Sequence, residues 1–261
     1  MEICDNTILI TGGTSGIGFE LAAQLLARGN KLIVTGRSQS NLDAASAALP
    51  GIHAVKSDVS DPGSIADLYQ HVAEEFPRMK MLINNAGVMR KINLQTAGSD
   101  LQDITREIEI NLSGSIRMVM QFLPLLKKQN KGAIVNVSSG LAFVPFAISP
   151  VYSATKAALH SFTQSLRIQL KNTNVSVFEL APPFTETPLF KDGFQTADFL
   201  GVKAMDVHTL ARYAIEQIEK DCLEIRPGLS NRLKLMSRVA PDIIFKQLSK
   251  SVENMHAEKR D

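Results

Sequence analysis

The stretch Thr7-Ile8-Leu9-Ile10-Thr11-Gly12-Gly13-Thr14-Ser15-Gly16-Ile17-Gly18 decides the fold. Its first five residues are apolar or β-branched, which is typical of a buried parallel strand. A glycine-rich loop follows at once, then a helical run over 19–27 that ends before Gly29, and then a second apolar strand over 31–35. Glycines permit a tight turn and a close approach of the backbone to a pyrophosphate at the helix N-terminus, so this βαβ unit predicts dinucleotide binding. The residues expected around the phosphates are Gly12, Thr14, Ser15, Gly16, Ile17 and Gly18.

Composition narrows the class of protein. Of 261 residues, 44% are apolar and 21% are charged, which excludes a disordered chain. The net charge of +2 gives no nucleic-acid footprint, and no apolar run reaches the roughly 18 residues of a membrane helix. The chain enters its first strand without a signal peptide, so we expect a cytoplasmic protein. Its two cysteines, Cys4 and Cys222, and its five scattered histidines have no metal-ligand spacing, so no metal site is predicted.

A second informative stretch runs from Ser138 to Lys156. Tyr152 and Lys156 are four residues apart on a helix expected over 150–170, so they lie on one face, and Ser139 follows an apolar strand over 133–137. An ammonium beside a phenol favours the phenolate, so we expect the pKa of Tyr152 to fall from about 10 and Tyr152 to act as a general acid. The Ser139 hydroxyl can bind a substrate oxygen. A tyrosine and a lysine at this spacing also occur on ordinary surface helices, so the pair decides nothing by itself.

The combined pattern resembles the short-chain dehydrogenase/reductase family over nearly the whole chain. It comprises Thr11-Gly12-x-x-x-Gly16-x-Gly18, Asn84-Asn85-Ala86-Gly87, and Ser139 thirteen residues before Tyr152-x-x-x-Lys156. The Ser-Gly-Leu-Ala-Phe run at 139–143, the run at 154–162 and Ala-Pro-Pro at 181–183 are similar to the DltE-like subgroup of bacterial reductases. The resemblance implies an NAD(P)-dependent enzyme acting on a carbonyl or secondary alcohol. It also implies four catalytic residues, Asn111, Ser139, Tyr152 and Lys156.

The resemblance implies further cofactor contacts outside the glycine loop. Besides Tyr152 and Lys156, they are Asp58, Val59, Asn85, Ala86, Gly87, Pro182, Thr185 and Thr187. Pro183 stands where the family usually has glycine, which stiffens the turn and removes a backbone donor.

The end of the second strand bears on the choice between NADP(H) and NAD(H). An NAD enzyme places an acidic residue there to bind the ribose 2′-hydroxyl. Here Gly36 and Arg37 occupy the place, and the nearest acidic residue is Asp43. A guanidinium suits a phosphate, so we expect NADP(H) to be preferred over NAD(H). The alternative is that Arg37 is a solvated loop charge. Many NADP members of the family carry a basic residue where this chain has Ser15, whose hydroxyl can still reach the phosphate.

The alternation of strands and helices, with right-handed crossovers, predicts a doubly wound α/β Rossmann fold. We expect one domain over residues 1–261, with a seven-stranded parallel sheet of order 3-2-1-4-5-6-7 and helices on both faces. A long helix is expected over 101–128, carrying Asn111 and bent by Pro124. In the family this helix and the Tyr152 helix pair across a twofold, so the resemblance implies a homodimer or homotetramer.

Two segments late in the chain are expected to shape the substrate site. Residues 189–206 are interpreted as a substrate lid, the alternative being a plain surface loop. Residues 231–261 are interpreted as a C-terminal helix, basic and amphipathic over 231–252, followed by a frayed tail. That helix has three possible roles: to cover the pocket, to meet a partner subunit, or to touch a membrane surface. The first two are favoured because a solvated charged face explains its lysines.

The segment between Ser139 and Tyr152 contains no charged residue. Burying a substrate charge against such a wall would cost several kcal/mol, so we expect an uncharged, partly apolar small-molecule substrate. Leu141, Phe143 and Phe146 are the expected pocket residues, unless the two phenylalanines pack in the core. Lid charges, namely Lys191, Asp192 or Lys203, could alter this picture. The main alternative to an enzyme is a non-catalytic NADP-binding scaffold or sensor; an epimerase is disfavoured because only about 70 residues follow Thr187.

Overall fold

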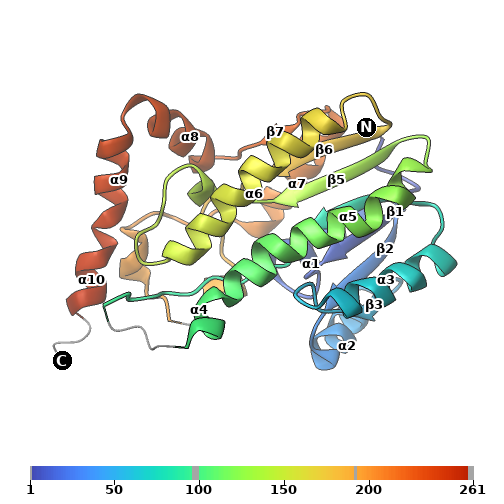
Figure 1. Ribbon diagram of the computed structural model, residues 1–261, viewed down its shortest axis with the longest axis horizontal. Helices are drawn as coiled ribbons and strands as arrows, with labels where there is room; N and C mark the ends of the chain where they lie inside the picture. The colour runs from blue at the N-terminus through green and yellow to red at the C-terminus, as the bar shows by residue number, and fades with distance from the viewer. Residues whose placement is uncertain (1, 96–99, 191–192, 258–261) are drawn as a thin grey trace.

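The computed structural model describes residues 2–95, 100–190 and 193–257. Its centre is a seven-stranded sheet in the order β3-β2-β1-β4-β5-β6-β7, in which every neighbouring pair is parallel (Figure 1). The predicted fold class and strand order are therefore confirmed. The strands are β1 (Thr7–Thr11), β2 (Lys31–Gly36), β3 (His53–Lys56), β4 (Met79–Asn84), β5 (Gly132–Val137), β6 (Val175–Leu180) and β7 (Glu224–Ile225).

Helices cover both faces of the sheet because its central strands are apolar on both sides. One core lies between the sheet and helices α1 (Gly16–Leu26) and α7 (Val207–Glu219). A second core lies under α3 (Pro62–Glu75), α5 (Gly114–Lys127) and α6 (Pro150–Gln169) (Figure 1). Helix α2 (Gln39–Ala48) packs beside β3.

The start of α3 follows the pattern expected from its sequence. The Asp61 carboxylate accepts a hydrogen bond from Gly63 N at 2.9 Å, and Pro62 occupies the first helical position. Helix α7 is capped in the same way, because Asp206 accepts from Thr209 N at 2.7 Å.

The helix expected over 101–128 is not one regular helix. It consists of α4 (Leu101–Ile108), a π-helical turn at Glu109–Ser113, and α5. The π-helical turn contains Asn111, whose side chain bonds to neighbouring segments, and Pro124 lies inside α5. A π-turn adds one residue to the helix locally, which turns the Asn111 side chain into the fold.

The single C-terminal helix and frayed tail were predicted wrongly. The chain forms α8 (Leu229–Val239), α9 (Pro241–Ser249) and α10 (Ser251–Ala257). Pro241 breaks the run because it cannot continue α8 but suits the first position of a new helix. Met255 is buried, so α10 is packed; 258–261 lie outside the described residues. The three helices lie beyond the carboxyl ends of the strands (Figure 1).

The expected lid joins β6 to α7 through two short 3₁₀ turns, Pro188–Phe190 and Thr196–Phe199. A bridge between Thr185 and Met205 closes its base. Lys191 and Asp192 lie outside the described residues, and Lys203 is exposed. Among the residues that the structure describes, no helix is long and apolar enough to cross a membrane.

Candidate active site

The glycine loop is fixed by the loop that follows β4. The Thr11 hydroxyl oxygen accepts hydrogen bonds from the backbone N–H groups of Asn85 (3.0 Å) and Ala86 (3.1 Å). The Asn85 amide donates to Gly12 O at 2.9 Å. A Cβ on Gly18 would lie 2.3 Å from Asn85 Nδ2, so only glycine lets the two loops meet here.

The N-terminus of α1 is shaped to receive an anion. Ser15 occupies the N-cap position, but its exposed side chain makes no capping hydrogen bond. Gly16 has φ +53°, and a Cβ there would lie 3.2 Å from Thr187 Cβ. Thr187 therefore lies against the glycine loop although the two are far apart in sequence. The free N–H groups at the helix N-terminus, and a glycine backbone without side chains in the way, fit the pyrophosphate of a dinucleotide.

The carboxyl ends of β2 and β3 supply the surface expected to hold the adenosine half. A Cβ on Gly36 would lie 2.9 Å from Thr14 Cγ2, so this corner is open only with glycine. Arg37 is exposed and its guanidinium makes no ion pair with any described residue. Asp58 Oδ1 accepts from Ser60 N at 2.9 Å, and Val59 packs against Gly114.

Asn111 is fully buried and joins the loop after β4 to α6. Its Nδ2 donates to Val88 O at 2.9 Å and to Thr155 Oγ1 at 3.1 Å, while its Oδ1 accepts from Val88 N at 2.9 Å. The π-helical turn gives Asn111 this reach. The residue therefore sets the distance between the loop and the helix that carries Tyr152 and Lys156.

Lys156 lies next to Asn111 across Gly87. Its Nζ donates to Val137 O at 2.9 Å. A Cβ on Gly87 would lie 3.3 Å from Asn111 Oδ1 and 3.6 Å from Lys156 Nζ, so the absence of a side chain keeps both groups accessible to each other. Burial alone lowers the pKa of the Lys156 ammonium to about 8.

Tyr152 and Ser139 form the other half of the candidate site. The Ser139 hydroxyl lies close enough to the phenol to affect its pKa, and the Ser139 Oγ accepts from Leu141 N at 3.1 Å. Burial raises the pKa of Tyr152 to about 12; the Ser139 hydroxyl lowers it and the buried Glu107 carboxylate raises it further. The predicted fall in this pKa is therefore wrong for the protein as it stands. The Lys156 ammonium lies 5.6 Å from the Tyr152 ring centroid, and desolvation outweighs it.

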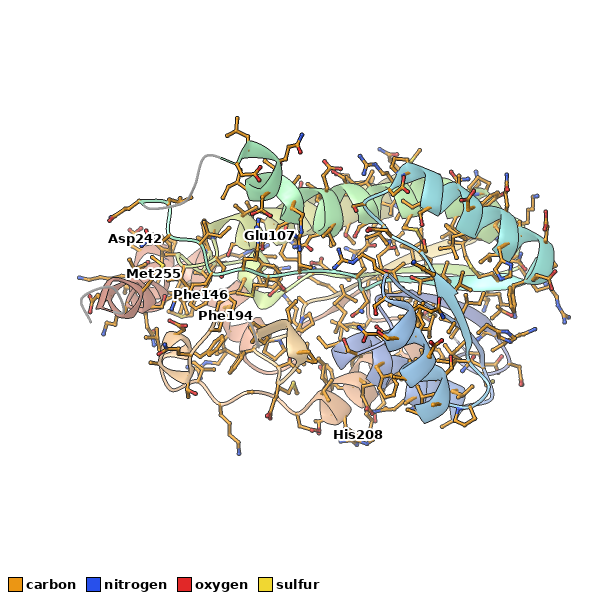
Figure 2. The ribbon with its side chains drawn as sticks, turned by 90° about the horizontal axis from the view of Figure 1, so that it is seen from below. Glu107, Phe146, Phe194, His208, Asp242 and Met255 are labelled. Carbon is orange, nitrogen blue, oxygen red and sulfur yellow. The ribbon has the colours of Figure 1, made fainter. Side chains whose placement is uncertain are left out.

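Ser139 and Tyr152 open into an apolar pocket. Leu141 and Phe146 line it, together with Ile17 of the glycine loop and Thr187. The lid contributes aromatic rings to the pocket, and Phe199 of the lid stacks on Phe184, which precedes the lid, with 3.9 Å between centroids. Phe146, Phe194 and Met255 lie together in this region (Figure 2).

Phe143, the third residue expected in the pocket, packs elsewhere. Its ring lies edge-on to His160 at 5.1 Å, and Lys234 Nζ is 5.3 Å from its centroid. The 3₁₀ turn Gly140–Ala142 (η2) causes this placement, because it turns Leu141 toward the pocket and Phe143 back onto α6. The structure therefore does not place Phe143 among the residues that line the pocket.

Sequence reasoning missed two buried charged groups near the site. Asp198 borders the pocket, is fully buried, and pairs with Lys91 Nζ at 3.0 Å. Glu107 is also fully buried and accepts from Arg90 N at 3.0 Å (Figure 2). Burial raises the pKa of Glu107. Asp198 and Lys91 are far apart in the sequence, so no local pattern indicated this pair. Glu107 could have been noticed, because it lies about one helical turn before Asn111.

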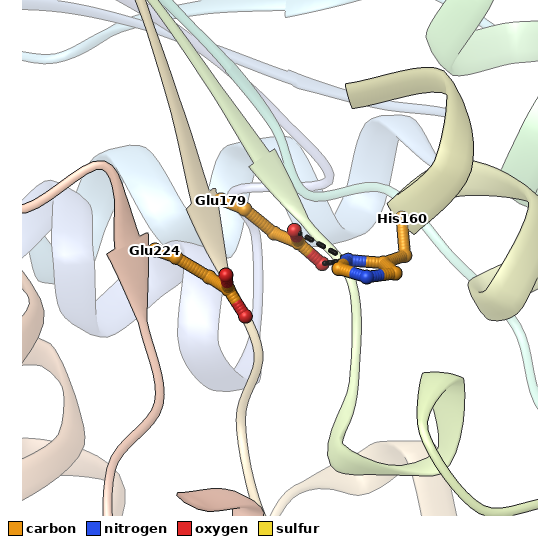
Figure 3. Close-up of side chains that lie close together, drawn as sticks. All are labelled: His160, Glu179 and Glu224. Carbon is orange, nitrogen blue, oxygen red and sulfur yellow. Dashed lines mark hydrogen bonds and ion pairs between the residues drawn. The ribbon is translucent and has the colours of Figure 1, made fainter. Parts of the chain in front are cut away.

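A third polar group lies behind Phe143. His160, Glu179 and Glu224 bring ligand-type atoms within 4.8 Å of one another (Figure 3). Glu179 pairs with His160 Nδ1 at 2.7 Å and accepts from the Ser138 hydroxyl at 2.5 Å. Lys234 is already ion-paired with Glu224, so these contacts form an ion-pair network that supports the Ser139 loop.

The fold and the glycine loop at the N-terminus of α1 are typical of proteins that bind a dinucleotide. A family model described as short chain dehydrogenase matches residues 6–198, and the chain belongs to that family. This confirms the expected class, an NAD(P)-dependent dehydrogenase or reductase.

The particular relatives agree with the predicted subgroup. The chain is 39% identical to the uncharacterized oxidoreductase DltE of Bacillus subtilis, over 95% of this chain and 98% of that protein. A short chain dehydrogenase from Burkholderia cenocepacia, solved in complex with NADP, superposes with a TM-score of 0.81 at 25% identity, covering 95% of this chain and 99% of that one. A Burkholderia phymatum enzyme of the same fold, solved with NAD, gives 0.80 at 24% identity, with 91% and 95% covered.

Proposed function

We propose that the protein transfers a hydride between NADP(H) and the carbonyl or secondary alcohol of an uncharged, partly apolar small molecule. The observation that carries this proposal is that Ser139 and Tyr152 both line an apolar pocket, while Lys156 and Asn111 lie beside Gly87 and on or bonded to the helix that carries Tyr152. The nicotinamide cofactor, when bound, supplies or accepts the hydride.

The residues divide the remaining work. With its pKa at about 12, Tyr152 is protonated at neutral pH and can donate a proton to the oxygen that becomes an alcohol. The Ser139 hydroxyl steadies the same oxygen. Lys156, with its pKa at about 8, is largely charged at neutral pH and is placed to hold a ribose hydroxyl. Asn111 fixes the spacing between loop and helix, and we propose that it also anchors a proton-conducting water.

Residues on five loops support the cofactor site. They are Gly12, Thr14, Ser15, Gly16, Ile17 and Gly18; Arg37; Asp58 and Val59; Asn85, Ala86 and Gly87; and Pro182, Thr185 and Thr187. The open corner at Gly36 and the exposed guanidinium of Arg37 support NADP(H) over NAD(H). Solved relatives bind NADP in one case and NAD in another, so the choice rests on these two residues.

The pocket supports the proposed substrate class. Its walls are aromatic and aliphatic, and the carboxylate of Asp198 is already neutralised by Lys91. An anionic substrate would lose its hydration there without gaining a partner among the described lining residues. We propose that residues 189–206 act as the lid, since Phe190 and Phe199 of this segment line the pocket.

We also propose an oligomeric state and a cellular compartment. Met120 of α5 and Ile168 of α6 are 64% and 71% exposed, which supports pairing of these helices in a homodimer or homotetramer. Cys4 and Cys222 are both free thiols, which supports a reducing compartment such as the cytoplasm.

The test is the Tyr152→Phe variant, which keeps the ring and removes the proton. NADPH oxidation with ketones, aldehydes and quinones should fall roughly 10²–10⁴-fold, the usual span for a positioned acid. NADPH binding, followed by fluorescence titration, should persist. Wild-type turnover by the variant would refute the assignment, and no turnover by either protein on any carbonyl would favour the non-catalytic scaffold or sensor.

A further inference from the structure

Helices α8 and α9 have two apolar faces, of which only one is used inside the molecule. On the inner face, Leu229, Leu233 and Leu248 line the substrate pocket. The outer face comprises the sides of the two helices that are turned away from the pocket. Four large apolar side chains are exposed there: Leu235 (62%), Val239 (73%), Ile243 (66%) and Phe245 (45%), with Ile243 and Phe245 on different sides of α9. They lie on two helices that pack against each other at one end of the molecule (Figure 1).

The same outer face is strongly cationic. Residues 229–250 contain five Lys or Arg and one Asp, a net charge of +4, whereas the whole chain carries only +2. Of these cations, Lys234 is buried against Glu224, while Arg232, Arg238, Lys246 and Lys250 are exposed. None of the four exposed cations forms an ion pair with a described residue. The exposed acid, Asp242, lies in the first turn of α9.

We propose that this outer face of α8 and α9, the docking face, binds an anionic lipid surface. Exposed apolar side chains interleaved with lysine and arginine are the pattern of helices that lie in the plane of a membrane interface. The apolar side chains enter the acyl boundary, and the cations meet lipid phosphates.

A second copy of the chain fits the docking face poorly. A twofold interface would place the face against itself, so four exposed cations would meet four exposed cations with one carboxylate on each side. Such like-charge contact opposes association. Anionic lipid supplies the opposite charge that the protein itself does not.

Docking in this way has a consequence for the substrate, which rests on the proposed function. Since α8 and α9 separate the pocket from the docking face, their inner leucines would lie between the lipid and Tyr152. An apolar carbonyl compound dissolved in the bilayer would then enter the pocket without crossing water.

The chain contains no tryptophan, which gives a direct binding assay. A Phe245→Trp variant carries a single emitter on the docking face, and Tyr213→Trp carries one at a similarly exposed position on α7. With vesicles of phosphatidylcholine and phosphatidylglycerol, Phe245→Trp emission should shift to the blue and recover at high salt. Pure phosphatidylcholine should give a much weaker shift, and Tyr213→Trp should not respond.

Charge variants measure the electrostatic part. Arg238→Gln and Lys246→Gln, each combined with Phe245→Trp, should each weaken partitioning about fivefold, because a surface cation near anionic lipid is worth about 1 kcal/mol. Lys171→Gln and Lys220→Gln remove exposed cations elsewhere and should leave partitioning unchanged.

Three results would overturn the proposal: no blue shift with anionic vesicles, an equal response from both tryptophans, or a doubling of mass in solution that Ile243→Ser abolishes. The last result would show a second copy on the docking face. The proposed enzymatic function stands or falls separately, because Tyr152→Phe should still bind vesicles and Arg238→Gln should still reduce a water-soluble ketone.

Discussion

Burial of Lys156 places a charged group in the candidate site at a cost to the stability of the folded protein. Its side chain is buried, and the pKa of its ammonium is lowered from 10.5 to about 8 with burial as the cause. Replacing it in Lys156→Met keeps an unbranched side chain, one heavy atom shorter, and removes the charge. We expect the variant to be inactive and yet more stable than the wild type at neutral pH.

The size of the effect follows from the pKa difference. At pH 7 the folded protein holds a charged Lys156 at a cost of about 3 kcal/mol, since one pKa unit is worth about 1.4 kcal/mol. The variant also loses the hydrogen bond to Val137 O, which is worth roughly 1.5–3 kcal/mol for a charged donor. The net stabilisation at pH 7 should therefore be small, about 0–2 kcal/mol.

The pH dependence is a sharper test than the net value. A lysine whose folded pKa is lowered binds its proton more weakly in the folded state, so wild-type stability rises as the pH goes from about 8 toward 10.5 and is flat below 8. Between pH 7 and pH 10 the wild type should gain about 2–3 kcal/mol relative to Lys156→Met. Every other titrating group is common to both proteins and cancels in the difference.

Urea unfolding of both cofactor-free proteins at several pH values gives this difference directly. Lys171→Met, at an exposed lysine, is the control and should track the wild type. If the stability curves of the wild type and Lys156→Met ran parallel from pH 7 to pH 10, the buried lysine would not have the lowered pKa on which the reasoning depends.

Three further predictions concern the site. Arg37→Asp should weaken NADPH binding roughly 10–100-fold and spare or improve NADH binding, because a carboxylate repels the 2′-phosphate. Titration of both cofactors into both proteins measures this. Tighter binding of NADH than of NADPH by the wild type would contradict the prediction. Phe146→Leu should raise KM for an apolar ketone about tenfold, whereas Phe143→Leu should leave KM unchanged, since of these two residues only Phe146 lines the pocket. Equal changes in KM would be inconsistent with the geometry. Glu107→Gln should move the alkaline limb of ketone reduction to lower pH, because the Glu107 charge raises the pKa of Tyr152; an unchanged limb in the kcat/KM profile would exclude that coupling.

Local patterns in the sequence predicted most of the fold. The strand-to-helix run from Thr7 to Gly18 needs only nearby residues: β-branched side chains for the strand and glycines where the loop meets Asn85 and Thr187. The cap at Asp61 is likewise local. Once the order of the strands is given, the face that each helix covers follows, because each crossover between parallel strands has one allowed hand.

The corrections arose where a local rule competed with a distant contact or was applied incompletely. Asn111 bonds to Val88 and Thr155, and the helix adopts a π-turn around those contacts, which periodicity does not record. The pKa of Tyr152 depends on how deeply the phenol is buried, and spacing alone says nothing of depth. Pro241, by contrast, was a local signal for the break between α8 and α9 that the amphipathic pattern concealed.

The substrate pocket was the least predictable part because it is assembled from segments that lie far apart in the sequence. Met89 follows β4, Phe146 precedes α6, Phe199 belongs to the lid, Leu233 to α8 and Leu248 to α9. Each is an ordinary apolar residue in its own segment, and its role in the pocket is evident only when the other segments are placed around it. The type of reaction can therefore be predicted from short local motifs, whereas the choice of substrate depends on the packing of the lid and the C-terminal helices. Variants of those segments should change KM more than kcat.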